Sequence, residues 1–235
     1  MKQGQRLRLL MIAGREIAAH AKHAILMRHD ITEPVIPERV REGDDVVVFV
    51  HGLFSTAGVL RPLRRVLERH PGVHTAAMTY PTGPSVAELG KRLSALIDAL
   101  PKRVSLHLVG HSMGGIVARY YVFTQSAHHP KVVQTISMAS PFAGIPKAAL
   151  LGFGSARDLD PQSELLRKLR LFGTDTVPHL SIIAENDVIV GAPLSHALPG
   201  GEVSVLSGRG HNGILFDDET AAIVERRVLS YRKTA

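Results

Sequence analysis

The stretch Val104-Ser105-Leu106-His107-Leu108-Val109-Gly110-His111-Ser112-Met113-Gly114-Gly115-Ile116-Val117-Ala118-Arg119 decides the fold of this chain. Its first half is an apolar run that ends abruptly at Gly110, which predicts a buried strand. Its second half predicts the first turns of a helix. The residues between them have the form G-x-S-x-G, which at a strand-to-helix turn is a nucleophile elbow. A serine in that strained turn has an accessible hydroxyl. The alternative is a serine that caps an ordinary helix.

The composition indicates one globular α/β domain. The chain has 235 residues, of which 45% are hydrophobic and 21% charged. It has no cysteine, which excludes disulfides, thiol nucleophiles and thiolate metal sites. No apolar run approaches the roughly 20 residues that cross a bilayer. The run from Leu9 to Ala13 is also too short for a signal-peptide core of about 7–15 residues, so we expect a cytoplasmic protein.

The net charge of +7 favours contact with anionic surfaces such as phospholipid headgroups. There is no dense basic run and no nucleic-acid-binding motif, so we expect no nucleic-acid partner. A basic amphipathic helix is predicted within residues 1–30, and Pro34 and Pro37 then mark a connector that ends near residue 40. Its apolar stripe comprises Leu7, Leu10, Met11, Gly14, Ile17, Ala18, Ala21 and Ile25.

Two interpretations of this helix remain open. It could lie on a membrane or cover the entrance of an active site. It could also pack on the domain through its apolar side, which we favour because most amphipathic helices face a core.

Strands and helices alternate over the rest of the chain, residues 41–235. Strands are predicted at 45–50, 73–80, 104–109, 132–138, 179–184 and 202–207, with helices after most of them. Ser85 and Glu88 form a capping box, so Ser85 is interpreted as structural. Asp160-Pro161 predicts the start of a short helix inside the irregular segment 141–178. The alternation predicts a mostly parallel sheet with helices on both faces.

A serine nucleophile needs a base, and the base needs a group that orients it. Asp187 follows the strand at 179–184, and His211 follows the strand at 202–207 in a glycine-rich loop. Loops at the carboxyl ends of parallel strands converge on one crevice, so Ser112, Asp187 and His211 are predicted to meet there. Asp175 and then Glu185 are the alternative acids. The rival histidines His128, His129 and His196 are interpreted as surface or capping residues.

The oxyanion of acyl transfer needs hydrogen-bond donors that are fixed in advance. One candidate is the backbone N–H of Met113, directly after the serine. The other is the N–H of Leu53, because Gly52 permits a tight turn after the strand that ends in Val50-His51.

The motifs His51-Gly52-Leu53, Gly110–Gly115 and the segments around Asp187 and His211 resemble the α/β-hydrolase superfamily, in particular its bacterial lipases and esterases. Ser140–Gly144 and Gly154–Leu159 are similar to that family's proline segment and cap region. The resemblance covers about residues 45–230. It implies an α/β-hydrolase fold with a small cap and ester hydrolysis through an acyl-enzyme, without an organic cofactor. Some relatives bind structural calcium; we find no clear ligand cluster here and predict no metal.

The substrate class stays broad at this level. We expect a small-molecule or lipid ester, with a phospholipid or acylglycerol favoured by the basic N-terminal helix. Thioesterase or acyltransferase activity would use the same triad, and a non-catalytic binding protein of this fold is the other alternative. Segment 141–178 is the predicted lid, where Leu165 and Leu169 could line an acyl channel or pack as an ordinary cap. The predicted pocket residues are His51, Gly52, Phe54, His111, Phe142, Leu150, Leu151 and Phe153.

Overall fold

A parallel sheet forms the centre of the computed structural model, which describes residues 3–125 and 132–232, with side chains from residue 10 onward. Within these residues the sheet has six strands in the order β2-β1-β3-β4-β5-β6, and every neighbouring pair is parallel. The strands are β1 (Asp45–Val50), β2 (Val73–Met78), β3 (Ser105–His111), β4 (Val132–Met138), β5 (His179–Ala184) and β6 (Glu202–Leu206). The predicted parallel sheet is confirmed, and it brings all the strand-end loops to one edge.

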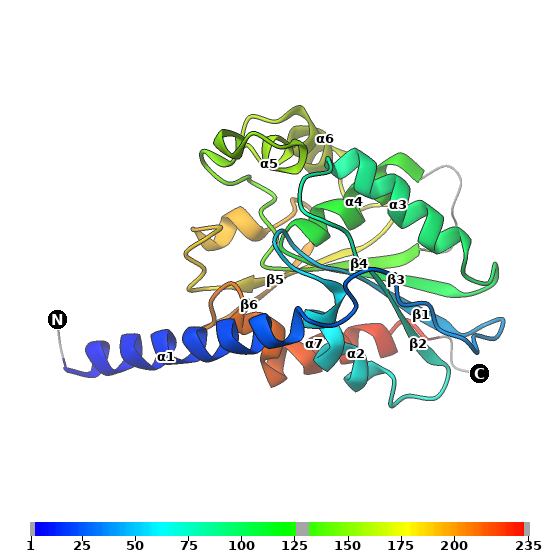
Figure 1. Cartoon of the computed structure of the whole chain (residues 1–235), viewed down its shortest axis with the longest axis horizontal. Helices are drawn as coiled ribbons and strands as arrows, with labels where there is room; N and C mark the ends of the chain where they lie inside the picture. Colours follow the sequence, from blue (N-terminus) through cyan, green and yellow to red (C-terminus); the bar gives the residue numbers. More distant parts are fainter. Residues whose placement is uncertain (1–2, 126–131, 233–235) are drawn as a thin grey trace.

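Helices cover both faces of the sheet (Figure 1). One face carries α3 (Val86–Asp98), α4 (Met113–Gln125) and α6 (Glu164–Phe172), and the other carries α2 (Arg61–Leu67) and α7 (Asp218–Leu229). Alternate residues of β1 enter the two cores: Val48 packs with the α3 and α4 side, and Phe49 packs with the α2 and α7 side. Because β1 is buried on both faces, the five residues that follow Asp45 are all apolar rather than alternating.

Short helices complete the loops. Within the described residues these are η1 (Ala57–Leu60), η2 (Ala148–Leu151), α5 (Gly154–Asp158), η3 (Pro193–His196) and η4 (Gly213–Phe216). No helix in the described ranges is long and apolar enough to cross a bilayer.

Segment 141–178 is anchored to the sheet domain. The Asp158 carboxylate accepts the backbone N–H of Val86 at 2.6 Å, which ties α5 to the start of α3. The prediction that Asp160-Pro161 begins a helix is wrong, because Asp160 lies in a turn and the Ser163 hydroxyl caps α6 by accepting the N–H of Leu166. Leu169 is fully buried in the core, so it packs as an ordinary cap residue and does not line a channel.

Helix α1 (Gln3–Leu26) extends well beyond the edge of the sheet domain (Figure 1). The favoured prediction, packing through the apolar stripe, is wrong: Leu10 and Ile17 are 70% and 72% exposed. The helix instead packs through Glu16, Ala19 and His23. The reason is that the surface beneath it presents backbone N–H groups and a serine hydroxyl, which need polar partners when they are covered.

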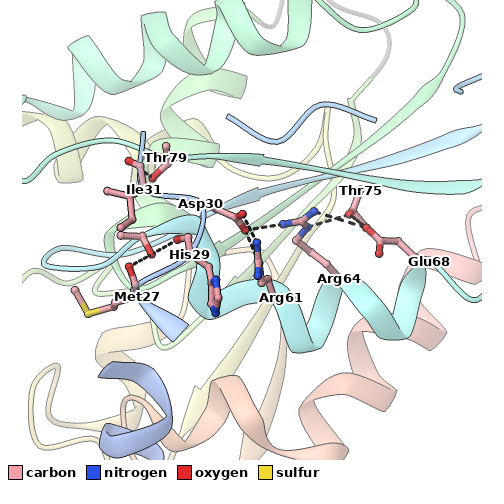
Figure 2. A network of polar contacts seen from close by, with 10 residues as sticks. Met27, His29, Asp30, Ile31, Arg61, Arg64, Glu68, Thr75 and Thr79 are labelled. Carbon is pink, nitrogen blue, oxygen red and sulfur yellow. Dashed lines mark hydrogen bonds and ion pairs between the residues drawn. The ribbon is translucent and has the colours of Figure 1, made fainter. Parts of the chain in front are cut away.

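The chain directly after α1 is held by an ion-pair network with α2 (Figure 2). The Asp30 carboxylate accepts hydrogen bonds from Arg61 at 2.7 Å and from Arg64 at 3.2 Å. The hydrogen bond from Arg61 is the main reason that the pKa of Asp30 lies below its usual value. The Thr56 hydroxyl is within 3.2 Å of the Met27 carbonyl and 3.0 Å of the His29 carbonyl. The carboxyl end of α1 is therefore attached to η1 and α2.

Candidate active site

Ser112 lies at the turn between β3 and α4 with φ of +53°, in the left-handed region that non-glycine residues rarely adopt. Its N–H donates to the Met138 carbonyl at 2.8 Å. The neighbouring glycine Gly114 has no room for a side chain, since a Cβ there would lie 2.0 Å from the Val50 carbonyl oxygen. The sharp turn and the close approach of α4 to β1 account for the G-x-S-x-G pattern.

Asp187 and His211 come together from the loops after β5 and β6. His211 Nδ1–H donates to Asp187 Oδ2 at 2.6 Å, and the other carboxylate oxygen accepts the N–H groups of Ile189 and Val190 at 2.8 and 2.9 Å. Burial alone would raise the pKa of Asp187, but His211 and the two N–H groups hold it below its usual value. Because the Nδ1–H points to the carboxylate, Nε2 is the His211 nitrogen that is available to accept a proton.

His111, the residue before Ser112, joins the elbow to the His211 loop. Its Nε2–H donates to the His211 carbonyl at 2.9 Å, and the two ring centroids are 4.9 Å apart. Burial, and then the charge of His211, lower the pKa of His111 well below its usual value, so the ring is neutral. Among the described residues no hydrogen bond joins Ser112 Oγ to His211; such bonds are often long until substrate binds.

The loop after β1 passes directly beside Ser112. His51 Nδ1–H donates to the Gly52 carbonyl at 2.7 Å, and its Nε2 accepts the Tyr80 N–H at 3.2 Å. Burial lowers the pKa of His51 to about 4, which keeps the ring neutral for these two bonds. In a trans peptide the C=O and the next N–H point in opposite directions. Fixing the Gly52 carbonyl toward His51 therefore directs the Leu53 N–H away from it.

For the ester hydrolysis that the family resemblance implies, the Gly52→Ala variant is expected to lose about 10²-fold in kcat. A Cβ at this position would lie 2.8 Å from the Ser112 Cβ, so the loop must shift and move the Leu53 N–H. The measurement is steady-state turnover of a chromogenic acyl ester. Gly14→Ala is the control, because a Cβ there meets nothing within 4 Å, and it should leave kcat unchanged. An unchanged kcat in Gly52→Ala would contradict the assignment of this loop.

Some of the predicted pocket residues lie at the surface, and others lie in the core. Leu150 and Leu151 lie exposed on η2. Phe54 is also exposed and meets Phe153 edge-on, with ring centroids 6.1 Å apart. Phe142 is fully buried against the ring of His179. His51, Gly52 and His111 lie beneath or beside the serine and hold its surrounding loops.

Of the alternative acids and bases in the described residues, His196 is the one that lies close to the Asp187 carboxylate. Asp175 is exposed, and Glu185 accepts the N–H of Gly208. The interpretation of His196 as a surface residue is wrong: it is buried with Nε2 4.0 Å from Asp187 Oδ2, on the same carboxylate as His211, and burial lowers its pKa. His128 and His129 lie outside the described residues. No group of three or more histidine, aspartate or glutamate side chains in the described ranges could hold a metal ion.

Two residues of α1 that the sequence patterns did not indicate contact the loops of the site. Glu16 Oε1 accepts the N–H groups of Gly210 and Gly213, on either side of His211, at 3.1 and 3.0 Å. His23 Nε2 lies 3.2 Å from the hydroxyl of Ser55, in the loop after β1. One signal was present, because Glu16 is the single acidic residue of a basic helix. The family resemblance could not find either residue, since it begins near residue 45.

The chain is similar to known hydrolases in fold. A family model described as a PGAP1-like alpha/beta domain matches residues 86–150. The mature lipase BlEst2 of Bacillus licheniformis has 14% identity and a TM-score of 0.65, covering 83% of this chain and 97% of that one. A monoacylglycerol lipase of Paleococcus ferrophilus has 19% identity and a TM-score of 0.62, with coverages of 80% and 96%.

Carboxylesterase CesB of Bacillus subtilis has 14% identity and a TM-score of 0.56, covering 93% of this chain and 98% of that one. No curated protein sequence matches the chain. With the parallel sheet, these likenesses show that the chain has the α/β-hydrolase fold and is lipase- and esterase-like in structure.

Proposed function

We propose that this protein of α/β-hydrolase fold is a serine hydrolase that cleaves carboxylic esters through an acyl-enzyme. The observation that carries the proposal is the 2.6 Å hydrogen bond between His211 and Asp187, linked through His111 to a serine at φ of +53°. Ser112 is the nucleophile, His211 the base and then the acid, and Asp187 the group that orients His211. The N–H groups of Leu53 and Met113 stabilise the oxyanion.

The proposed reaction has two steps. The Ser112 hydroxyl attacks the ester carbonyl carbon while His211 Nε2 takes its proton, and the C=O electron pair moves to the oxyanion. The intermediate collapses by breaking the bond to the alcohol oxygen, which takes the proton from Nε2. Water then attacks the acyl-enzyme in the same way and releases the acid and free Ser112. Asp187 stabilises the charged His211 that forms in each step.

An apolar rim supports an ester with an apolar acyl chain, such as an acylglycerol or phospholipid. The rim consists of exposed side chains on loops that follow β1, β4 and β5, at the edge of the sheet where Ser112 lies. Val188, next to Asp187, is 94% exposed. Exposed apolar side chains on several loops at one edge of a sheet favour a surface that binds apolar ligands. The other members of the rim are Phe54, Leu150, Leu151, Ile189 and Leu194.

The test of this function is labelling with a fluorophosphonate probe together with hydrolysis of p-nitrophenyl esters of increasing chain length. We expect labelling at Ser112 and a kcat/KM that rises from acetate to medium and long acyl chains. Absence of labelling would contradict catalysis and favour a binding protein of this fold. A product in which another hydroxyl carries the acyl group would identify an acyltransferase, and preference for thioesters would identify a thioesterase.

We also propose that α1 contacts anionic lipid surfaces. Its apolar stripe faces solvent, Arg15 is exposed, and Lys22 adds a positive charge whose ammonium lies 4.9 Å from the centroid of the Phe216 ring. Apolar side chains flanked by basic residues on one helix are typical of peripheral binding to anionic membranes.

The double variant Leu10→Ser, Ile17→Ser is expected to bind phosphatidylglycerol vesicles about 10-fold or more weakly than wild type, because each leucine or isoleucine buries apolar area in the interface. Vesicle co-sedimentation measures this. Ile31→Ser is the matched control, since Ile31 is exposed but lies outside the helix, and its binding should not change. Equal binding of the double variant and wild type would contradict the proposal.

A further inference from the structure

The inner side of α1 contacts both loops that flank the catalytic serine. Glu16 lies against the loop that carries His211, and His23, two turns later on the same side, lies against the loop after β1 that carries Leu53. These loops come from opposite ends of the sequence and need a fixed separation for catalysis. A single rigid helix that touches both can set that separation.

The Glu16 side chain packs closely against the loop that carries His211. One oxygen, Oε1, accepts both backbone N–H groups, so the residues before and after His211–Asn212 are held by a charged acceptor. At both glycines the Glu16 carboxylate occupies the space that a Cβ would take. A Cβ on Gly210 would lie 2.3 Å from Glu16 Cδ, and one on Gly213 would lie 2.2 Å from Glu16 Oε1.

The helix that supplies Glu16 is itself anchored. Figure 2 shows Asp30 between Arg61 and Arg64, directly after the helix. A Cβ on Gly58 would lie 2.2 Å from the Leu26 carbonyl oxygen, so the carboxyl end of α1 rests directly on η1. Because the carboxyl end is attached to the domain, the position of Glu16 is determined by the helix rather than by a flexible loop.

We propose, on the basis of the function above, that Glu16 is a positioning residue for the catalytic histidine and that α1 acts as a brace between the His211 loop and the loop of Leu53. Asp187 holds the ring of His211, and His111 holds its carbonyl. Glu16 holds the backbone on both sides. Without it, a loop with glycines at both ends regains freedom that Asp187 alone does not restrict.

His23 holds the loop after β1, as Glu16 holds the loop of His211. Its hydrogen bond with Ser55 lies two residues beyond Leu53, whose N–H is a proposed oxyanion donor. Ser55 is buried, so this bond is shielded from competing water. His23→Ala is expected to lower kcat by about 3–10-fold, the loss that one neutral hydrogen bond accounts for.

The experiment compares Glu16→Ala, Glu16→Gln and Glu225→Ala in the full chain, well below the Tm of each. Glu16→Ala is expected to lower kcat about 10–100-fold with KM changed less than about 3-fold, because the ring is displaced from the serine. Glu16→Gln should stay within about 3-fold of wild type, since its amide oxygen accepts the same two N–H groups. Glu225 is the control, a half-buried glutamate that pairs with His70 away from the site, and its variant should match wild type.

A second readout separates positioning from general stability. The NMR signal of the His211 Nδ1 proton, bonded to Asp187, is expected to shift in Glu16→Ala but not in Glu225→Ala. Wild-type kcat in Glu16→Ala, or an equal loss in Glu16→Gln, would overturn the inference. If wild type itself neither hydrolyses esters nor reacts with a fluorophosphonate, the proposed function fails instead, so the two failures are distinguishable.

Discussion

Replacing Ser112 by alanine is expected to lower kcat for the proposed ester hydrolysis by roughly 10⁴–10⁶-fold, because the variant lacks the proposed nucleophile. The residual rate reflects the oxyanion donors and substrate binding alone. The measurement is turnover of a chromogenic acyl ester, with fluorophosphonate labelling of the same samples. Undiminished turnover in the alanine variant would contradict the assignment of Ser112.

Ser112→Gly is the matched variant. It also removes the hydroxyl, but it relieves the backbone strain that alanine keeps. It should lose the same activity, but it should be more stable than Ser112→Ala by about 1 kcal/mol, because glycine adopts a φ of +53° without strain. Thermal unfolding of the two variants checks this. A lower Tm for the glycine variant would show that the elbow does not carry the expected strain.

The Asp187→Asn variant is expected to lower kcat by about 10³–10⁴-fold with little effect on folding. The asparagine oxygen can still accept the N–H groups of Ile189 and Val190, so its NH₂ group faces His211. The asparagine NH₂ group therefore donates a hydrogen bond to His211 at the position where the Asp187 carboxylate accepts one. Nδ1 of His211 must then be the acceptor and Nε2 carries the proton, which is the wrong tautomer for a base.

Kinetics and the nitrogen chemical shifts of His211 test this together: kcat should fall and the Nε2–H tautomer should dominate. Asp175→Asn is the control, since Asp175 is exposed, and it should behave as wild type. A large loss in Asp175→Asn with none in Asp187→Asn would mean that the acid has been misassigned.

Local sequence patterns were sufficient to predict most of the fold. The strand at 132–138 and the Ser85 capping box are found as predicted, because apolar strand runs and cap residues act over a few neighbouring positions. The start of α6 was predicted three residues too early. Asp160-Pro161 and Ser163 are both suitable helix starts, and only packing selects between them.

Short-range patterns could not predict what α1 contacts. Its apolar stripe indicated a face that packs on the domain, yet that face is exposed and the polar side is the one covered. Periodicity shows that a helix has two faces, but the choice between them depends on what the domain presents. Here the domain presents the N–H groups of Gly210 and Gly213 and the hydroxyl of Ser55, which Glu16 and His23 satisfy.

The sequence by itself therefore determined the β3–Ser112–α4 elbow, the parallel sheet and the order of the three candidate catalytic residues, because each depends on local spacing and on the common edge of parallel strands. Only the tertiary structure removed the alternative acid Asp175, which is exposed, and showed that Glu16 holds the loop around His211. The Glu16 contacts join residues 194 and 197 positions apart, and no spacing rule in a single sequence encodes such a distance.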